Sequence, residues 1–90
     1  MNPENQIQVK IFSLIQENRT QEARKICEDL LNNYPKSEIL YKALGIINFG
    51  SREFDLAINF FIKSIKYNAD QPEVLNNIGV CYKEKGELKN

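Results

Sequence analysis

The two cysteines, Cys27 and Cys81, are the side chains of this sequence best suited to nucleophilic or metal chemistry. The 90 residues contain no histidine, which is the commonest general base and a frequent partner of cysteine in zinc sites. Two cysteines are also too few for a disulfide framework. We therefore expect both to be small buried apolar residues, with no metal site and no bound cofactor.

Acidic and hydroxyl side chains offer no better candidates for catalysis. Glu28 and Asp29 follow Arg24 and Lys25 closely, a pattern typical of a solvated helix face. The four serines have no set of base and orienting residue beside them. The four glycines are dispersed rather than gathered into a phosphate-binding loop. We expect that the chain is not an enzyme.

Charge and hydropathy argue against two kinds of partner. The 12 basic and 12 acidic residues give a formal net charge of zero, whereas a nucleic-acid binder normally needs an excess of positive charge. No apolar stretch is long enough to span a membrane, and residues 1–12 lack the features of a secretory signal. We expect a cytoplasmic chain that binds neither nucleic acid nor membrane.

One repeating period organises the sequence. When the sequence is shifted against itself by a fixed number of residues, Leu44 and Gly45 align with Ile78 and Gly79. The same shift aligns Ala23 with Ala57, without any gap. We call this shift one period. Within each period the apolar residues recur at helical spacing, and Ser37 is a suitable N-cap residue for the third helix. The pattern predicts no strand and five helices, near residues 4–17, 20–33, 38–50, 53–67 and 72–85.

This pattern resembles the tetratricopeptide repeat family, whose unit of about 34 residues equals the period and folds as two antiparallel helices. The second unit carries most of the family's signature residues: Tyr41, Leu44, Gly45, Phe54, Ala57, Phe61 and Ser64. The resemblance implies an all-α fold, a right-handed α-solenoid of antiparallel helix pairs. It also implies a single domain over residues 1–90, with units at about 4–37, 38–71 and, in part, 72–90.

Small residues at equivalent positions predict close packing within each helix pair. Gly45 and Gly79 lie inside expected helices, where glycine costs about 1 kcal/mol relative to alanine. We expect these glycines, with Ala23 and Ala57, to let paired helices approach each other. Ile11 replaces the glycine in the first unit, which predicts a bulkier pair at the end of the array. With about two and a half repeats present, we expect either a longer array or an edge covered by another chain.

The family places a concave groove for a partner peptide or helix along the first helices of successive pairs. The resemblance carries this role to nine residues of this sequence: Phe12, Ile15, Lys42, Ile46, Phe49, Asn76, Asn77, Val80 and Lys83. The apolar middle of this set favours an amphipathic helix or an apolar peptide as the partner. The alternative, that the apolar members belong to the core, stays open. It applies most to Phe49. The second unit has Asn48 at the place where the third unit has the larger Tyr82, and Phe49 would fill the space that this difference leaves.

Asn77 has a second interpretation within the family. One sub-type, a superhelix attached to a glycosyltransferase, lines its groove with one backbone-binding asparagine per repeat. Asn77 stands at that place, but Val9 and Ala43 occupy it in the other two units. Asn77 as a solvated helix residue is therefore the favoured interpretation.

Three functions fit these observations. The first is a non-catalytic protein–protein interaction scaffold that binds a partner peptide or helix in its groove. The second is a self-associating module that forms a homo-oligomer through its exposed edge and apolar strip. The third is the N-terminal interaction module of a larger enzyme, such as a glycosyltransferase.

Overall fold

The computed structural model describes residues 3–89, with side chains described for residues 6–86. These residues form five α-helices and no strand, as the sequence pattern predicts. The helices are α1 (Pro3–Gln16), α2 (Thr20–Leu31), α3 (Glu38–Gly50), α4 (Phe54–Tyr67) and α5 (Pro72–Lys89). The largest difference from the predicted bounds is in α5, which continues past the expected end at residue 85.

Local signals set the starts of α3 and α5. The hydroxyl of Ser37 accepts a hydrogen bond from the backbone N–H of Leu40 at 3.3 Å, which confirms Ser37 as the N-cap residue. At the start of α5, the carbonyl of Gln71 accepts from the N–H groups of Val74 and Leu75, at 3.0 and 3.1 Å. Pro72 then opens the helix at a position where its missing N–H costs nothing.

The turns after α1 and α3 have the same backbone geometry and stand one period apart. Asn18 and Arg52 both adopt left-handed φ angles, 62° and 61°. In each turn the N–H of the next residue donates to a carbonyl in the last turn of the preceding helix, 2.8 Å to Leu14 and 2.9 Å to Asn48. The sequence period is therefore also a period of the backbone.

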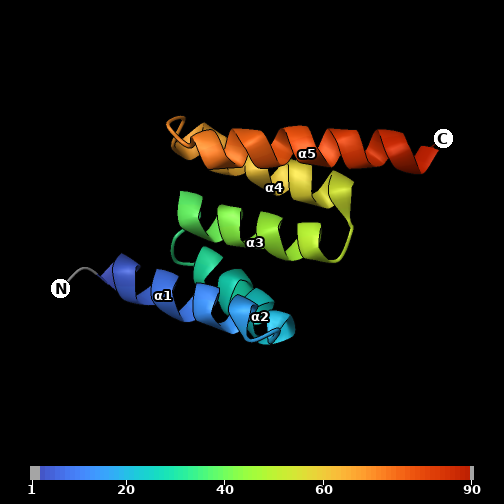
Figure 1. Cartoon of the computed structure of the whole chain (residues 1–90). Coiled ribbons are helices and arrows are strands. Elements are labelled where there is room, and N and C mark those ends of the chain that lie inside the picture. Colours follow the sequence, from blue (N-terminus) through green and yellow to red (C-terminus); the bar gives the residue numbers. More distant parts are fainter. Residues whose placement is uncertain (1–2, 90) are drawn as a thin grey trace.

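The helices follow one another in space in chain order, from α1 and α2 at one end to α5 at the other (Figure 1). Each packs on its neighbours in the chain, and α1 also contacts α3. Two apolar clusters fill the interior. The first joins α1, α2 and α3: Ile11, Leu14, Ala23, Cys27, Leu40, Ala43, Leu44 and Ile47. The second joins α4 and α5: Phe54, Ala57, Ile58, Phe61, Val74 and Cys81. This order of helices fits an array of helical repeats.

Gly45 provides the close approach that its position predicts. A Cβ atom built on Gly45 would lie 2.5 Å from two carbon atoms of the Phe61 ring, and Phe61 is fully buried. The ring therefore occupies the space in which any larger residue at position 45 would place its side chain. Gly79, one period later, has nothing within 4 Å of such an atom.

The first pair is not simply bulkier, which corrects the expectation from Ile11. Ile11 takes the place of Gly45, and Cys27 takes the place of Phe61, since each stands one period earlier. Both Ile11 and Cys27 are fully buried in the first cluster. In the second pair the larger residue, Phe61, is on the second helix, whereas in the first pair the larger residue, Ile11, is on the first helix. The bulk of Ile11 is therefore matched by a small residue on α2.

Candidate protein-binding face

Lys42 lies at the centre of a face to which α1, α3 and α5 all contribute. Its ammonium nitrogen is 5.9 Å from the centroid of the Phe12 ring on α1 and 3.5 Å from Oε1 of Glu73 on α5. The Lys42 side chain is 19% exposed, whereas that of Glu73 is 59% exposed. The first helices of successive pairs therefore meet around one cation. We call these three helices' shared surface the α1–α3–α5 face.

Glu73 is held as a carboxylate at this place. Its own backbone N–H, and then Lys42, lower the pKa of the Glu73 carboxyl below its usual value. The carboxylate side of this ion pair is open to solvent, and a pair with that exposure contributes little to stability. Loss of the contact with Glu73 would therefore cost the fold little.

The apolar residues predicted for the groove are half-buried. Phe12 and Ile15 pack against the first cluster, and Ile46 and Phe49 pack against the second. Val80 on α5 is also half-buried. Each side chain thus has one side against the core and another side open to solvent, so the two alternatives for these residues are not exclusive.

The polar residues predicted for the groove differ in their environments. Asn76 and Lys83 on α5 are exposed. Asn77 is half-buried, and the residue one period before it, Ala43, is fully buried in the first cluster. Asn77 is therefore turned further toward the interior than Asn76 or Lys83.

Phe49 does not fill space left by Asn48, which corrects that hypothesis. Asn48 is itself fully buried. Its amide donates to the carbonyl of Leu44 at 3.0 Å and accepts from two guanidinium nitrogens of Arg24 at 3.3 and 3.4 Å. The Phe49 ring instead meets Phe54 edge-on, with ring centroids 5.8 Å apart at an interplanar angle of 76°. A buried amide needs such partners, and the spacing of the sequence did not show where they would come from.

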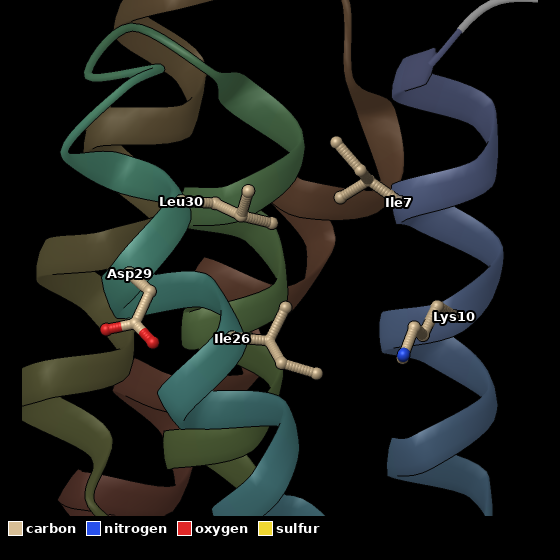
Figure 2. Close-up of a pocket in the computed structure, with 5 residues that line it drawn as sticks. All are labelled: Ile7, Lys10, Ile26, Asp29 and Leu30. Carbon is tan, nitrogen blue, oxygen red and sulfur yellow. The ribbon is translucent and has the colours of Figure 1, made fainter.

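A pocket of about 240 Å³ opens between α1 and α2. Ile7 and Lys10 from α1 face Ile26 and Leu30 from α2 across it, with Asp29 beside them (Figure 2). Spacing within the sequence does not predict this pocket. Its walls are mainly apolar, with one cation and one carboxylate.

The equivalent place between α3 and α4 is filled by aromatic rings. Tyr41 stands one period after Ile7, and Phe60 one period after Ile26. The Tyr41 ring stacks on those of Phe60 and Tyr67, with centroids 6.5 and 5.8 Å apart. The aliphatic residues of the first pair are smaller, so the hollow follows from a substitution that is visible in the aligned sequence.

Both cysteines are buried, as expected. Burial, and then the nearby Glu28 carboxylate, raise the pKa of the Cys27 thiol to about 11. Burial also raises the pKa of Cys81. A thiol in this environment is protonated at neutral pH and is a poor nucleophile.

Metal-binding clusters and membrane-spanning helices are both missing from the part of the chain that the structure describes. Within it, no group of three or more histidine, cysteine, aspartate or glutamate residues could hold a metal ion. None of the described helices has the length and apolar character needed to cross a bilayer.

Comparison with known proteins gives a partial similarity. A UDP-N-acetylglucosamine–peptide N-acetylglucosaminyltransferase from Caenorhabditis elegans is 30% identical to this chain over 69 residues, which is 77% of the chain. The chain spans only 6% of the length of that enzyme. No family model matches the chain. No solved structure matches it.

Proposed function

We propose that this chain is a non-catalytic protein-interaction module of the tetratricopeptide type, built as a right-handed α-solenoid. The turns that repeat with the sequence period and the stacking of helices in chain order support this architecture. The observation that carries the function is the junction at Lys42. There, a mostly buried cation and half-buried apolar side chains from successive pairs share one face.

The chemistry of this face defines the partner. Half-buried Phe12, Ile46 and Val80 offer apolar contact, and Lys42 offers one cation whose present partner, Glu73, is exposed. A helix or extended peptide with apolar anchors and a central carboxylate would bury the apolar side chains and replace Glu73 at Lys42. The stacked helices hold these groups in place before binding, so little ordering is needed on this side of the interface.

A second candidate function follows from the similarity to the transferase. The aligned 69 residues make up a small part of an enzyme that, by its name, transfers N-acetylglucosamine to peptide. In this proposal the chain is an interaction module of a larger enzyme of that kind, and the α1–α3–α5 face guides a peptide. The chain itself remains non-catalytic in both candidates.

A selection of peptides tests the proposed face. Peptides would be selected from a displayed random library on the immobilised 90-residue chain, and their affinities measured for two charge-reversal variants. We expect Lys42→Glu to weaken binding of the selected peptides at least tenfold and Lys36→Glu, an exposed loop change, to leave it unchanged. Equal binding to both variants would show that partners use another surface.

A further inference from the structure

The pocket between α1 and α2 is separate from the α1–α3–α5 face. Ile7 and Lys10, which line its α1 side, stand three residues apart and therefore share one side of that helix. Phe12 comes two residues after Lys10, so it points to a different side of α1 and belongs to the α1–α3–α5 face. We call this hollow the α1–α2 pocket; its lining residues are Ile7, Lys10, Ile26, Asp29 and Leu30 (Figure 2).

The size and the walls of the α1–α2 pocket suit one small apolar group. Ile7, Ile26 and Leu30 are half-buried and pack against the first cluster, so the core holds these walls in place. An apolar cavity of about 150 Å³ is large enough to bind benzene. The α1–α2 pocket, at about 240 Å³, therefore has room for one aromatic ring with a short substituent.

The second pair shows which groups fit at this place. There the rings of Tyr41, Phe60 and Tyr67 stack on one another. The ammonium nitrogen of Lys63 lies 5.7 Å from the centroid of the Tyr41 ring and 6.0 Å from that of Phe60. The backbone plan of a pair thus accommodates aromatic rings with a lysine beside them. The first pair has the same plan with smaller aliphatic residues, so a ring supplied by a ligand would make the missing contacts.

Lys10 gives the α1–α2 pocket a cation that is free to bind an anion. It stands one period before Leu44, a buried member of the first cluster, yet Lys10 itself is exposed. Within residues 6–86, whose side chains the structure describes, Lys10 forms no ion pair. The pocket's carboxylate, Asp29, is already paired with Lys25 at 3.3 Å. The charge left to balance at this pocket is therefore positive.

We propose that the α1–α2 pocket binds a small aromatic carboxylate. The ring lies between Ile7 and Ile26, at the place where the second pair has the rings of Tyr41 and Phe60, and the carboxylate pairs with the ammonium group of Lys10. This site goes beyond the protein-interaction role and does not depend on the α1–α3–α5 face, because it uses another side of α1 and a different kind of ligand.

Titration with three matched probes tests the ligand class. The probes are phenylpropionate, the corresponding alcohol and the corresponding amine, which share the ring and differ in the terminal group. Backbone amide shifts of the isotope-labelled 90-residue chain would follow binding. We expect saturable shifts confined to α1 and α2. Phenylpropionate should bind about threefold more tightly than the alcohol, and the amine should bind most weakly.

Three variants separate the role of the pocket walls from that of the cation. Ile26→Phe fills the pocket with a ring of the chain's own, so it should abolish binding of every probe. Lys10→Met should reduce the affinity for phenylpropionate to that for the alcohol and leave the alcohol unaffected. Lys36→Met, which removes the same charge from an exposed loop, is the matched control and should change neither. Because Lys10 is exposed, its variant keeps the test valid even where Ile26→Phe disturbs the fold.

Four results would overturn the proposal. The first is the absence of saturable shifts in α1 and α2 with any probe. The second is equal affinity for the three probes, or a preference for the amine. The third is unchanged phenylpropionate binding in Lys10→Met. The fourth is a 90-residue chain that light scattering shows to be a dimer and that Ile26→Phe converts to a monomer, because the pocket would then take a second copy.

Discussion

The pair α1–α2 and the pair α3–α4 share a backbone plan but fill it with different side chains. Both turn through a left-handed residue, at Asn18 and at Arg52, and both bury an alanine at the same place. The second pair places a ring directly over Gly45, whereas the first has Ile11 and Cys27 at these two positions. The second pair also holds three stacked rings where the first has a pocket of about 240 Å³.

This difference shows which features the repeat requires and which it leaves free. The turn geometry and the buried alanine recur because they set the distance and angle between paired helices. The side-chain volumes at positions 11 and 27 in the first pair, and at positions 45 and 61 in the second, need only be complementary. A pair can therefore change its large residue from one helix to the other without changing the backbone plan.

Overfilling the second pair should have the largest effect. In Gly45→Leu the new side chain must displace the buried Phe61 ring, because even its Cβ atom lies 2.5 Å from that ring. We expect the free energy of unfolding, measured by urea titration with circular dichroism, to fall by about 3 kcal/mol or more. Gly50→Leu is the control, since position 50 is open, and should change stability far less. Equal effects of the two changes would refute the close packing at Gly45.

Ionisation of Cys27 should weaken the first pair at alkaline pH. The pKa of Cys27 is raised from 9.0 to about 11, so the unfolded chain loses this proton before the folded chain does. Stability from this group is therefore complete below pH 9 and decreases between about pH 9 and pH 11, by at most about 3 kcal/mol in total.

Cys27→Ala isolates this contribution. The variant should be less stable at neutral pH, because it removes a buried side-chain atom, but its stability should fall less steeply than that of the parent between about pH 9 and pH 11. Urea titrations at several pH values measure both slopes. Parallel slopes would mean that the Cys27 thiol is not shielded in the folded chain.

Filling the pocket of the first pair should have the smallest effect, and it should be favourable. Ile26→Phe introduces the residue that the second pair has at Phe60, beside a hollow lined by Ile7 and Leu30. We expect the free energy of unfolding to rise by about 1 kcal/mol, through added apolar contact. The conservative control is Ile26→Leu, with little change expected. A loss of stability in Ile26→Phe would show that the pocket closes around the aliphatic side chains in solution.

Much of the fold could be predicted from the sequence because it follows from local rules and from one period. The helices, the cap at Ser37 and the close approach at Gly45 all follow from spacing and residue type. The compensation at Ile11 could not be predicted in this way, because it joins two positions on different helices and a comparison of single aligned positions does not connect them. The same limit hid the partners of Asn48.

The candidate site was harder to predict for a physical reason. The alignment of the repeats gives the side of the helix on which Phe12 or Ile46 lies. It does not give the distance between neighbouring helices, which decides how exposed these two side chains are. Lys42 illustrates this limit. Its contacts with Phe12 and Glu73 depend on how three helices stack, and no spacing within a single helix encodes them.

A double-mutant cycle at positions 45 and 61 tests the central claim most directly, namely that successive pairs are equivalent units with interchangeable large and small residues. Gly45→Ile and Phe61→Cys would be made singly and together, so that the double variant carries the first pair's residues in the second pair. The free energies of unfolding should show that each single change destabilises strongly, and that the double change is less harmful than their sum by about 1 to 3 kcal/mol. Strict additivity would contradict the equivalence of the two pairs.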